Sequence, residues 1–308
     1  MNYENVAVLL CTYNGEAFIR EQLDSIIAQD HRNWRIFVSD DGSTDNTLII
    51  IKEYQKFLGK DKLELLSGPK KGFSWNFINL IENCGEGYSY YALSDQDDEW
   101  MPNKLSKSIQ FLREIPSEKP AVYCGRTALI DGDGRDIGYS PIFKKQASFR
   151  NALIQSIAGG NTMVFNNAAR NIIKKTPKYF DIVSHDWWIY IIISGCGGVV
   201  NYDSEPTIKY RQHSANIVGS NISWSGRINR IFKLFDGHFR VWIQKNLDAM
   251  DGTSLPLTQE NREIFENFKK ARQASFIKRM CIFTKLALYR QTFLGSIAYL
   301  FAILVKKI

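Results

Sequence analysis

The first third of the chain alternates short apolar segments with longer segments of helical periodicity. The apolar segments are rich in β-branched residues and cover residues 6–11, 34–39, 63–66 and 90–94. After the first of them, Ile19, Leu23 and Ile26 recur at helical spacing, and residues 46–58 and 73–83 also read as helices. Strands that alternate with helices form mostly parallel sheets covered on both faces. The sequence therefore predicts an α/β fold with a Rossmann-like, mostly parallel central sheet flanked by helices.

The alternation becomes irregular after Pro102, which suits the first turn of a helix. The segments that then read as strands are 121–125, 127–130, 161–165, 199–202 and 207–210. From Trp224 onward the pattern is helical, with a break at residues 252–256. We therefore predict an α/β domain over residues 1–222 and a helical, basic C-terminal region over residues 223–308.

The basic charge of the chain lies in its C-terminal region. The net charge is +7, and from Ser225 onward 15 Lys and Arg stand against 6 Asp and Glu. The preceding residues hold the remaining 24 basic and 26 acidic side chains, so they are near neutral. This balance argues against a nucleic-acid groove on the main domain, and we expect no nucleic-acid partner. The basic region suits an anionic membrane surface or a polyanion.

Residues 291–305 form an uncharged, mostly apolar run between Arg290 and Lys306-Lys307. The run is shorter than the roughly 20 residues that a membrane-spanning helix needs. It predicts an interfacial helix or a membrane-docking hairpin, which would make the protein peripheral at the inner face of the membrane. The alternative is an ordinary packing helix or a dimer contact.

The cysteines and the N-terminal residues bear on the compartment. The five cysteines are widely spaced and include no Cys-x-x-Cys pair, so neither a disulfide framework nor a zinc site is indicated. The N-terminal segment lacks a basic stretch followed by a long apolar one, so we expect no secretory signal. Both features indicate a reducing, cytoplasmic compartment.

The segment Asp95-Gln96-Asp97-Asp98 directly follows a predicted strand. Three carboxylates in four residues repel one another unless a cation or hydrogen-bond donors neutralise them. Hard oxygen ligands favour Mg²⁺ or Mn²⁺, and such ions usually bind one or two carboxylates together with substrate phosphates. The alternative is an acidic turn that caps the helix after Pro102.

Two other polar loops follow strands of the same predicted sheet, Thr12-Tyr13-Asn14 and Asp40-Asp41. Ligands of open α/β sheets bind beyond the carboxyl ends of the strands, so these loops are expected beside the acidic segment. An aspartate there can accept hydrogen bonds from a ring N–H or from ribose hydroxyls. The alternative for Asp40-Asp41 is an ordinary acidic turn with Asp45 as the helix cap.

The segment His185-Asp186-Trp187-Trp188 places an acid beside aromatic rings. Such rings can form the wall on which a sugar packs, and the Asp186 carboxylate could take a proton from an acceptor hydroxyl. The alternative is a helix N-terminus with both tryptophans in the core. Farther along, His213 could add a nitrogen ligand to a metal held by Asp97, although a lone histidine is usually structural.

Two motif matches fail on inspection. Residues 131–142 resemble a calcium loop, but Asp136 stands where glycine is needed and Ile142 where glutamate is needed, so we expect a hairpin turn. The chain has neither Gly-x-Gly-x-x-Gly after its first strand nor a phosphate loop ending in Gly-Lys-Ser/Thr. Dinucleotide oxidoreductases and P-loop enzymes are therefore disfavoured.

Six segments in order resemble the motifs of family-2 glycosyltransferases, most closely the branch that includes bacterial rhamnosyltransferases. They are LLCTYNGEAFIREQLDSIIAQ, VSDDGSTDNT, KGFSWNF, LSDQDDEW, SHDWW and YRQHSANIVG, and the resemblance spans about residues 6–219. It implies a GT-A fold and an inverting enzyme that depends on Mn²⁺ or Mg²⁺. The donor would be a dTDP- or UDP-sugar, with dTDP-rhamnose among the candidates. The acceptor would be a hydroxyl of a glycan or a lipid-linked sugar in cell-surface polysaccharide synthesis.

The resemblance also implies roles for the donor-binding residues. Thr12, Tyr13 and Asp40 are expected near the base and ribose of the donor. Asn14 and Asp41 are expected as their neighbours. Lys71 and Asn76 stand where similar enzymes shape the diphosphate and sugar pocket.

The same resemblance assigns the metal and catalytic residues. Asp95 and Asp97 correspond to the Asp-x-Asp motif, with Asp97 on the metal and Asp95 on ribose or on metal-bound water. His213 resembles a histidine that contacts metal or phosphate, and Asp186 resembles the catalytic base. His185 stands where many relatives carry a second acid, a difference that bears on the sugar more than on the reaction.

Two other functions stay open at this stage. One is a non-catalytic nucleotide-sugar-binding protein of the same fold, against which the intact Asp186 argues. The other is a sugar nucleotidyltransferase, which lacks a use for the His-Asp-Trp-Trp segment and needs a basic, glycine-rich N-terminal loop that the sequence does not have.

Overall fold

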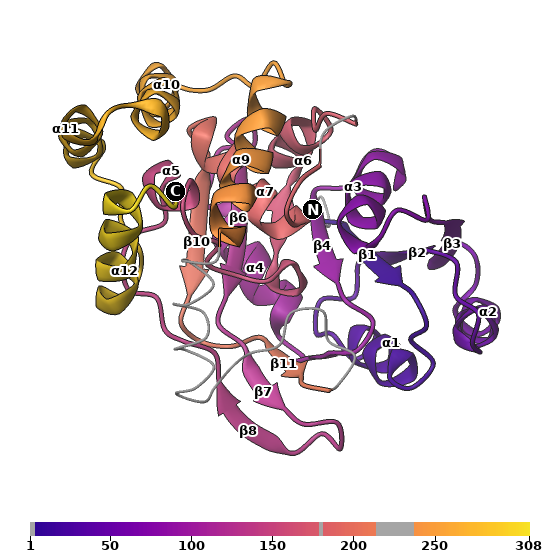
Figure 1. The fold of residues 1–308 in the computed structure, drawn as a ribbon. Helices are drawn as coiled ribbons and strands as arrows, with labels where there is room; N and C mark the ends of the chain where they lie inside the picture. The colour runs from indigo at the N-terminus through magenta and orange to yellow at the C-terminus, as the bar shows by residue number, and fades with distance from the viewer. Residues whose placement is uncertain (1–3, 179–180, 214–236) are drawn as a thin grey trace.

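The computed structural model describes residues 4–178, 181–213 and 237–308, and its centre is a seven-stranded sheet between layers of helices (Figure 1). The strand order is β10-β6-β9-β4-β1-β2-β3. The strands are β1 (Val6–Thr12), β2 (Trp34–Asp40), β3 (Leu63–Ser67), β4 (Tyr90–Ser94), β6 (Ala121–Gly125), β9 (Val164–Asn166) and β10 (Val199–Asp203). β9 is antiparallel to both neighbours, and the other pairs are parallel. The prediction of a mostly parallel sheet is confirmed.

Both faces of this sheet are buried, as β1 shows most simply. All seven residues of β1 are buried, and their side chains alternate between two hydrophobic clusters because successive strand residues point to opposite faces. One cluster lies under α1 (Ile19–Ile27), α2 (Thr47–Leu58) and α4 (Lys104–Arg113). The other lies under α3 (Phe73–Asn83), α6 (Asn167–Ile173) and α7 (His185–Gly195). Burial on both faces explains why these strands are continuously apolar.

A second, four-stranded sheet has the order β5-β11-β7-β8. Its strands are β5 (Glu99–Trp100), β11 (Ile208–Arg211), β7 (Ala128–Ile130) and β8 (Asp136–Tyr139). β7 and β8 are antiparallel neighbours around residues 131–135, which confirms the expected hairpin. β5 directly follows the acidic segment, and Lys209 of β11 pairs with Glu99 of β5. The small sheet therefore brings the end of β11 beside the acidic segment.

The remaining helical elements are α5 (Phe149–Ala152), the short 3₁₀ turn η1 (Gly160–Thr162), α9 (His238–Asp251), α10 (Gln259–Gln273), α11 (Phe276–Leu286) and α12 (Phe293–Leu304). The predicted strand over 161–165 is only partly right, because η1 occupies its first residues and β9 begins at Val164. Apolar residues of α9 to α12 share the hydrophobic cluster of α7. Within the described ranges, no helix is both long and apolar enough to cross a membrane. The boundary at residue 222 lies outside those ranges and stays a prediction.

Helix α7 corrects part of the expectation for His185-Asp186-Trp187-Trp188. Trp188 is fully buried, and its Nε1–H donates to Thr176 Oγ1 at 2.9 Å. Trp187 is buried as well, and its Nε1–H donates to the carbonyl of Ala152 at 2.7 Å. The prediction that the two tryptophans form a sugar-binding wall is therefore wrong. The physical reason is that α7 is enclosed on almost every side, so only one of its 11 residues is not buried.

His185 was expected to line the sugar pocket. The structure instead buries it inside the protein. Its ring is 4 % exposed and stacks on Phe77 with the ring centres 4.1 Å apart. Neither ring nitrogen has a hydrogen-bond partner in the described part of the chain. A Cβ added to Gly160 would lie 2.0 Å from His185 Nε2, so only glycine fits against the ring. Burial lowers the pKa of His185 to about 4, because the charged ring would lose its hydration.

Replacing His185 with glutamine should flatten the acid dependence of stability. In the unfolded chain the histidine binds its proton near pH 6.5, whereas the folded protein resists protonation down to about pH 4. Stability is therefore lost as the pH falls through this window, by about 3 kcal/mol. His185→Gln should remove this loss, as measured by urea unfolding at several pH values. His31→Gln, at a partly exposed site, is the control; an unchanged slope in His185→Gln would contradict the assignment.

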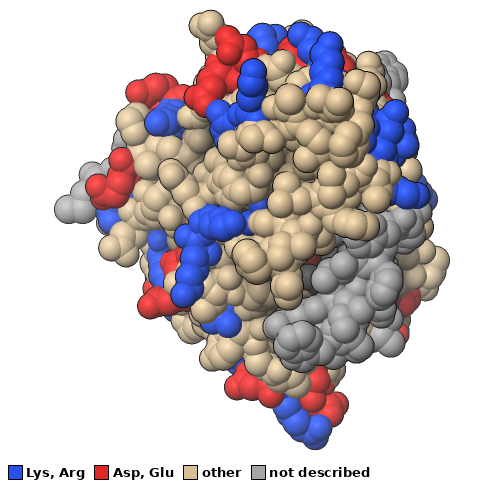
Figure 2. Space-filling view, turned by 60° about the vertical axis from the view of Figure 1, so that its left-hand side comes forward, with Lys and Arg blue, Asp and Glu red and all other residues tan. Residues whose placement is uncertain are grey.

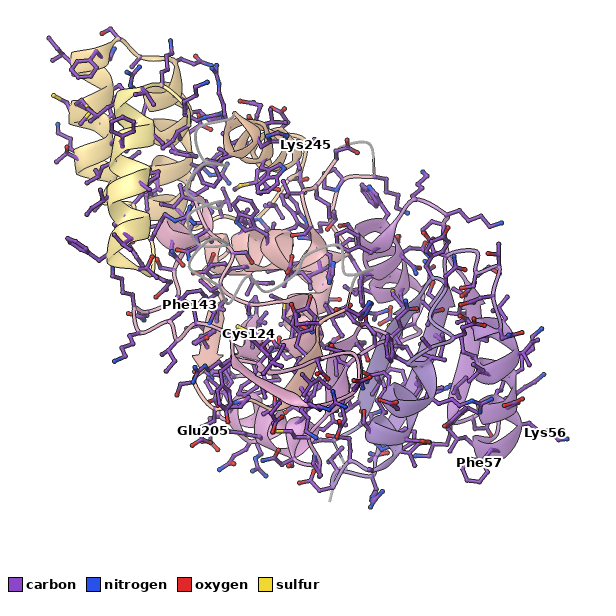
Figure 3. The ribbon with its side chains drawn as sticks, turned by 60° about the horizontal axis from the view of Figure 1, so that its bottom comes forward. Lys56, Phe57, Cys124, Phe143, Glu205 and Lys245 are labelled. Carbon is purple, nitrogen blue, oxygen red and sulfur yellow. The ribbon has the colours of Figure 1, made fainter. Side chains whose placement is uncertain are left out.

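Removing an aromatic ring from the core should lower the free energy of unfolding far more than removing an exposed ring. Phe165 on β9 is fully buried and stacks on Tyr91 at 5.7 Å, so Phe165→Ala should lower the free energy of unfolding by about 3–5 kcal/mol. Phe57 projects from α2 at the edge of the molecule and is 78 % exposed (Figure 3). Phe57→Ala should change the free energy by less than about 0.5 kcal/mol. Equal urea midpoints for the two variants would refute the placement of β9 in the core.

Candidate active site

The three polar loops lie at one edge of the main sheet. In the parallel register, Thr12 at the end of β1 is level with Asp40 at the end of β2. On the other side of β1, Leu10 is level with Ser94 at the end of β4, and Asp95 follows. This is the carboxyl edge, where open α/β sheets bind their ligands.

Asp40 organises the turn after β2. Its carboxylate accepts hydrogen bonds from Thr12 Oγ1 at 2.8 Å and from the backbone N–H groups of Ser43 and Gly42 at 2.8 and 3.1 Å. The Ser43 hydroxyl donates to it as well. Asp40 is only 6 % exposed, so its first role is to hold the ends of β1 and β2 together.

Asp41 points the other way, toward the loop that precedes α3. Its two oxygens accept from the backbone N–H groups of Lys70 at 2.6 Å and Gly72 at 2.9 Å. Lys71 lies between these two anchored residues and is exposed. The carboxylate thus fixes the backbone on both sides of the lysine that was expected near a diphosphate.

Asn76 is a support of the site and not part of an open pocket. It is 1 % exposed, and its Nδ2–H donates to the carbonyl of Ser39 at 2.9 Å while Oδ1 accepts from the Ser39 hydroxyl. Its expected part in shaping the diphosphate and sugar pocket stays a prediction. Both ends of its side-chain amide form hydrogen bonds that join α3 to β2, because a buried amide must find partners inside the protein.

The first loop is tied to the acidic segment by a residue that sequence reasoning passed over. Gln96 Oε1 accepts from the backbone N–H of Tyr13 at 2.9 Å, and Gln96 Nε2 donates to the carbonyl of Tyr13 at 3.0 Å. The Tyr13 ring is left 58 % exposed on this pinned backbone. Asn14 adopts a positive φ of 48°, and its Oδ1 accepts from the backbone N–H of Thr44 at 2.8 Å. The loop therefore presents an aromatic ring from a fixed position.

Asp97 and His213 meet as a pair. Asp97 Oδ2 and His213 Nε2 are 2.8 Å apart, and each side chain is 18 % exposed. Arg211, which is buried, donates through Nε to the carbonyl of Asp97 at 3.1 Å and forms an ion pair with Glu21. Sequence reasoning took only the histidine from this segment and missed the arginine. The sequence shows only a charged residue directly after the predicted strand 207–210; the structure adds that Arg211 is buried, and a buried charge must be paired.

Asp98 lies deeper than its neighbours and is 1 % exposed. Its carboxylate accepts from Asn161 Nδ2 at 2.6 Å and from the backbone N–H of Arg211 at 3.2 Å. Lys104, fully buried below, donates to the carbonyl of Asn161 at 2.7 Å. Burial raises the pKa of Asp98 to about 7 and lowers the pKa of Lys104 to about 7. Asp98 thus braces the loop instead of facing a ligand.

Asp95 and Asp186 belong to one electrostatic site. Burial raises the pKa of Asp95 well above its usual value, and the charges of Asp98, Asp97 and Asp186 raise it further. Asp186 is partly buried in the first turn of α7, where its Oδ1 accepts from the backbone N–H of Trp187 at 2.7 Å. The carboxylate expected to act as the base is therefore close enough to Asp95 to oppose its ionisation.

The donor set fits a divalent cation, although no ligand cage is pre-formed. Among the residues that the structure describes, no three His, Cys, Asp or Glu side chains are grouped to hold a metal ion. Asp97 and His213 are paired with each other. Asp95 lies near other carboxylates, whose negative charges raise its pKa. A cation beside Asp95, Asp97 and His213 would offset the negative charge of the two carboxylates. Such a site, with few protein ligands, suits a metal ion that also binds substrate phosphates.

Comparison with known proteins agrees with these features. The family model described as Glycosyl transferase family 2 matches residues 7–173. The dTDP-rhamnosyl transferase RfbG of Shigella flexneri is 32 % identical over 250 residues, which cover 78 % of this chain and 84 % of the relative. An uncharacterized glycosyltransferase of Rickettsia typhi, RT0329, is 26 % identical over 247 residues, covering 74 % of this chain and 73 % of that protein.

Two solved structures have the same fold. Residues 1–349 of Staphylococcus aureus TarS in complex with UDP-GlcNAc give a TM-score of 0.56 at 17 % identity, covering 85 % of this chain and 70 % of that 1–349 chain. The mannosyltransferase PcManGT of Pyrobaculum calidifontis, in complex with GDP-Man and Mn²⁺, gives 0.51 at 18 %, covering 98 % and 86 %. The predicted GT-A fold with its helical C-terminal region is confirmed. Since the family model matches over half of the chain, this protein is a glycosyltransferase and belongs to glycosyltransferase family 2.

Proposed function

We propose that the protein is an inverting rhamnosyltransferase that uses dTDP-rhamnose as its donor. The acceptor is a hydroxyl of a glycan or a lipid-linked sugar in cell-surface polysaccharide synthesis, at the inner face of the membrane. The similarity to a dTDP-rhamnosyl transferase supports the donor. The observation that supports the reaction is that Asp186, in the first turn of α7, lies near enough to the buried Asp95 for its charge to contribute to the raised pKa of that carboxyl.

The donor would lie across the three loops. The exposed Tyr13 would stack on the base, and the hydrogen-bonded Thr12 and Asp40 would lie near the base and ribose. Lys71, fixed on both sides by Asp41, would reach the diphosphate as a flexible cation. Asn14 shapes the first loop from behind. A UDP-sugar is the alternative donor, because these contacts do not distinguish uracil from thymine.

Asp97, His213 and Asp95 would hold Mn²⁺ or Mg²⁺ together with the diphosphate. When bound, the ion supplies positive charge that offsets the charge developing on the departing diphosphate. The presence of Mn²⁺ beside GDP-Man in PcManGT supports this choice of cofactor. The protein's own part is to keep Asp97 in place through the Arg211 contact with its carbonyl.

Asp186 would act as the general base. Its carboxylate takes the proton of the acceptor hydroxyl as that oxygen bonds to the anomeric carbon, and the bond from that carbon to the diphosphate oxygen breaks. One displacement needs one base and inverts the anomeric configuration. The alternatives are a non-catalytic nucleotide-sugar-binding protein and a sugar nucleotidyltransferase. Release of dTDP supports transfer, whereas release of pyrophosphate would indicate the nucleotidyltransferase.

Two substitutions should separate donor binding from chemistry. Asp97→Asn should abolish the Mn²⁺-dependent part of dTDP-rhamnose binding, because it removes a metal ligand. Asp186→Asn should leave donor affinity within about threefold and lower the rate of dTDP release by about 10²–10⁴, the usual contribution of a general base. Titration calorimetry measures the binding, and chromatography of released nucleotide measures the reaction.

The control is Asp61→Asn, which neutralises an exposed carboxylate outside the site and should behave as the unmodified protein. Thermal unfolding of each variant establishes that it is folded. Equal loss of donor binding in Asp97→Asn and Asp186→Asn would contradict the separate roles.

A further inference from the structure

Helix α12 is apolar on both of its faces. One face packs into the core through Ala298, Tyr299, Ala302 and Ile303. The other face exposes Phe293 (78 %), Leu294 (59 %), Ile297 (48 %), Leu300 (54 %) and Leu304 (42 %). A helix that lies on the surface of a soluble domain normally has a polar outer face, so this outer face calls for a partner.

A basic rim surrounds this apolar face. The neighbouring helix α11 adds the exposed apolar residues Phe276 and Ile277, and Lys278, Lys285 and Lys306 are exposed around them. No Asp or Glu occurs in the sequence after Glu266. Figure 2 shows a broad uncharged area on this side of the molecule, with both blue and red side chains at its border. We call these exposed residues of the two helices the α11–α12 surface.

The α11–α12 surface is held rigidly on the catalytic domain. Arg279 of α11 is buried and donates to the carbonyl of Leu304 at the end of α12 at 3.2 Å. The Phe283 and Tyr299 rings meet edge to face at 6.3 Å. Just before α12, Gln291 Nε2 donates to the carbonyl of Lys145 at 3.0 Å. Anything that binds this surface therefore also fixes the orientation of the domain.

We propose that the α11–α12 surface docks in the plane of an anionic lipid bilayer. The helix of 12 residues is about 18 Å long, too short to cross a hydrocarbon core of about 30 Å, so it lies along the interface. Phe293, Leu294 and Leu300 would enter the boundary between headgroups and acyl chains, and the lysines would lie on the anionic headgroups.

The charge pattern favours lipid over a second copy of the chain. A symmetric dimer brings the same patch of both subunits together, so the exposed lysines of the two copies would approach each other, and neither α11 nor α12 carries an acidic residue to pair with them. An anionic membrane neutralises the rim and accepts the apolar face at once. Membrane docking is argued from the surface alone. It rests on the proposed function only for its advantage to the enzyme, which would be closeness to a lipid-linked acceptor.

Vesicle flotation of the full-length protein tests the proposal. The vesicles contain phosphatidylcholine alone, or phosphatidylcholine mixed with phosphatidylglycerol, at low and high salt. The protein should float with the mixed vesicles, and high salt should weaken this binding. Phe293→Glu/Leu300→Glu should lower the partition coefficient at least about tenfold. Each of Lys278→Gln, Lys285→Gln and Lys306→Gln should lower it about fivefold, on the mixed vesicles only.

The matched control is Ile49→Glu/Phe57→Glu. It adds the same two charges at exposed apolar positions of α2, at the far end of the molecule from α12 (Figure 1), and should float as the unmodified protein does. Light scattering without lipid should give a monomer. A dimer that Phe293→Glu/Leu300→Glu dissociates would overturn the proposal, as would equal flotation of both double variants.

Donor binding without lipid distinguishes a failure here from a failure of the proposed function. Phe293→Glu/Leu300→Glu should bind dTDP-rhamnose as tightly as the unmodified protein, because α12 contributes nothing to the donor site. A protein that floats but binds no nucleotide sugar would refute the proposed function and leave membrane docking intact.

Discussion

Carboxylates crowd together at the carboxyl edge of the main sheet. Burial raises the pKa of Asp95, and the charges of Asp98, Asp97 and Asp186 raise it further, while the buried Lys104 acts in the opposite direction. Asn161 and the backbone of Arg211 neutralise Asp98 by hydrogen bonds, and His213 pairs with Asp97. The small sheet brings the end of β11, with Arg211, beside the acidic segment. What is left over is negative charge that favours a cation.

Much of the fold could be predicted from the sequence because its signals are local. The strand that begins at Val6 is apolar at every position, which is typical of a strand buried on both faces, and the helices between strands have regular periodicity. The short strand β5 could not be predicted. Its two residues follow the acidic segment and become a strand only by pairing with β11, over a hundred positions later.

The candidate site was predictable by residue type more than by orientation. Asp97 and His213 were expected together and lie together, because the strands that precede them end at neighbouring points. The tryptophans after Asp186 were misread, since a sequence does not tell whether a ring beside an acid faces solvent or core. Gln96 was missed because its function is to pair with the backbone of Tyr13, and backbone partners leave no pattern in a sequence.

The short turn at Gly160 and Asn161 contacts both the acidic segment and the start of α7. Asn161 grips the acidic segment through Asp98, while Gly160 lies flat against His185, the residue that precedes the proposed base. A side chain at position 160 would collide with His185 and would have to displace the first turn of α7, so the backbone of this turn and the position of Asp186 depend on each other.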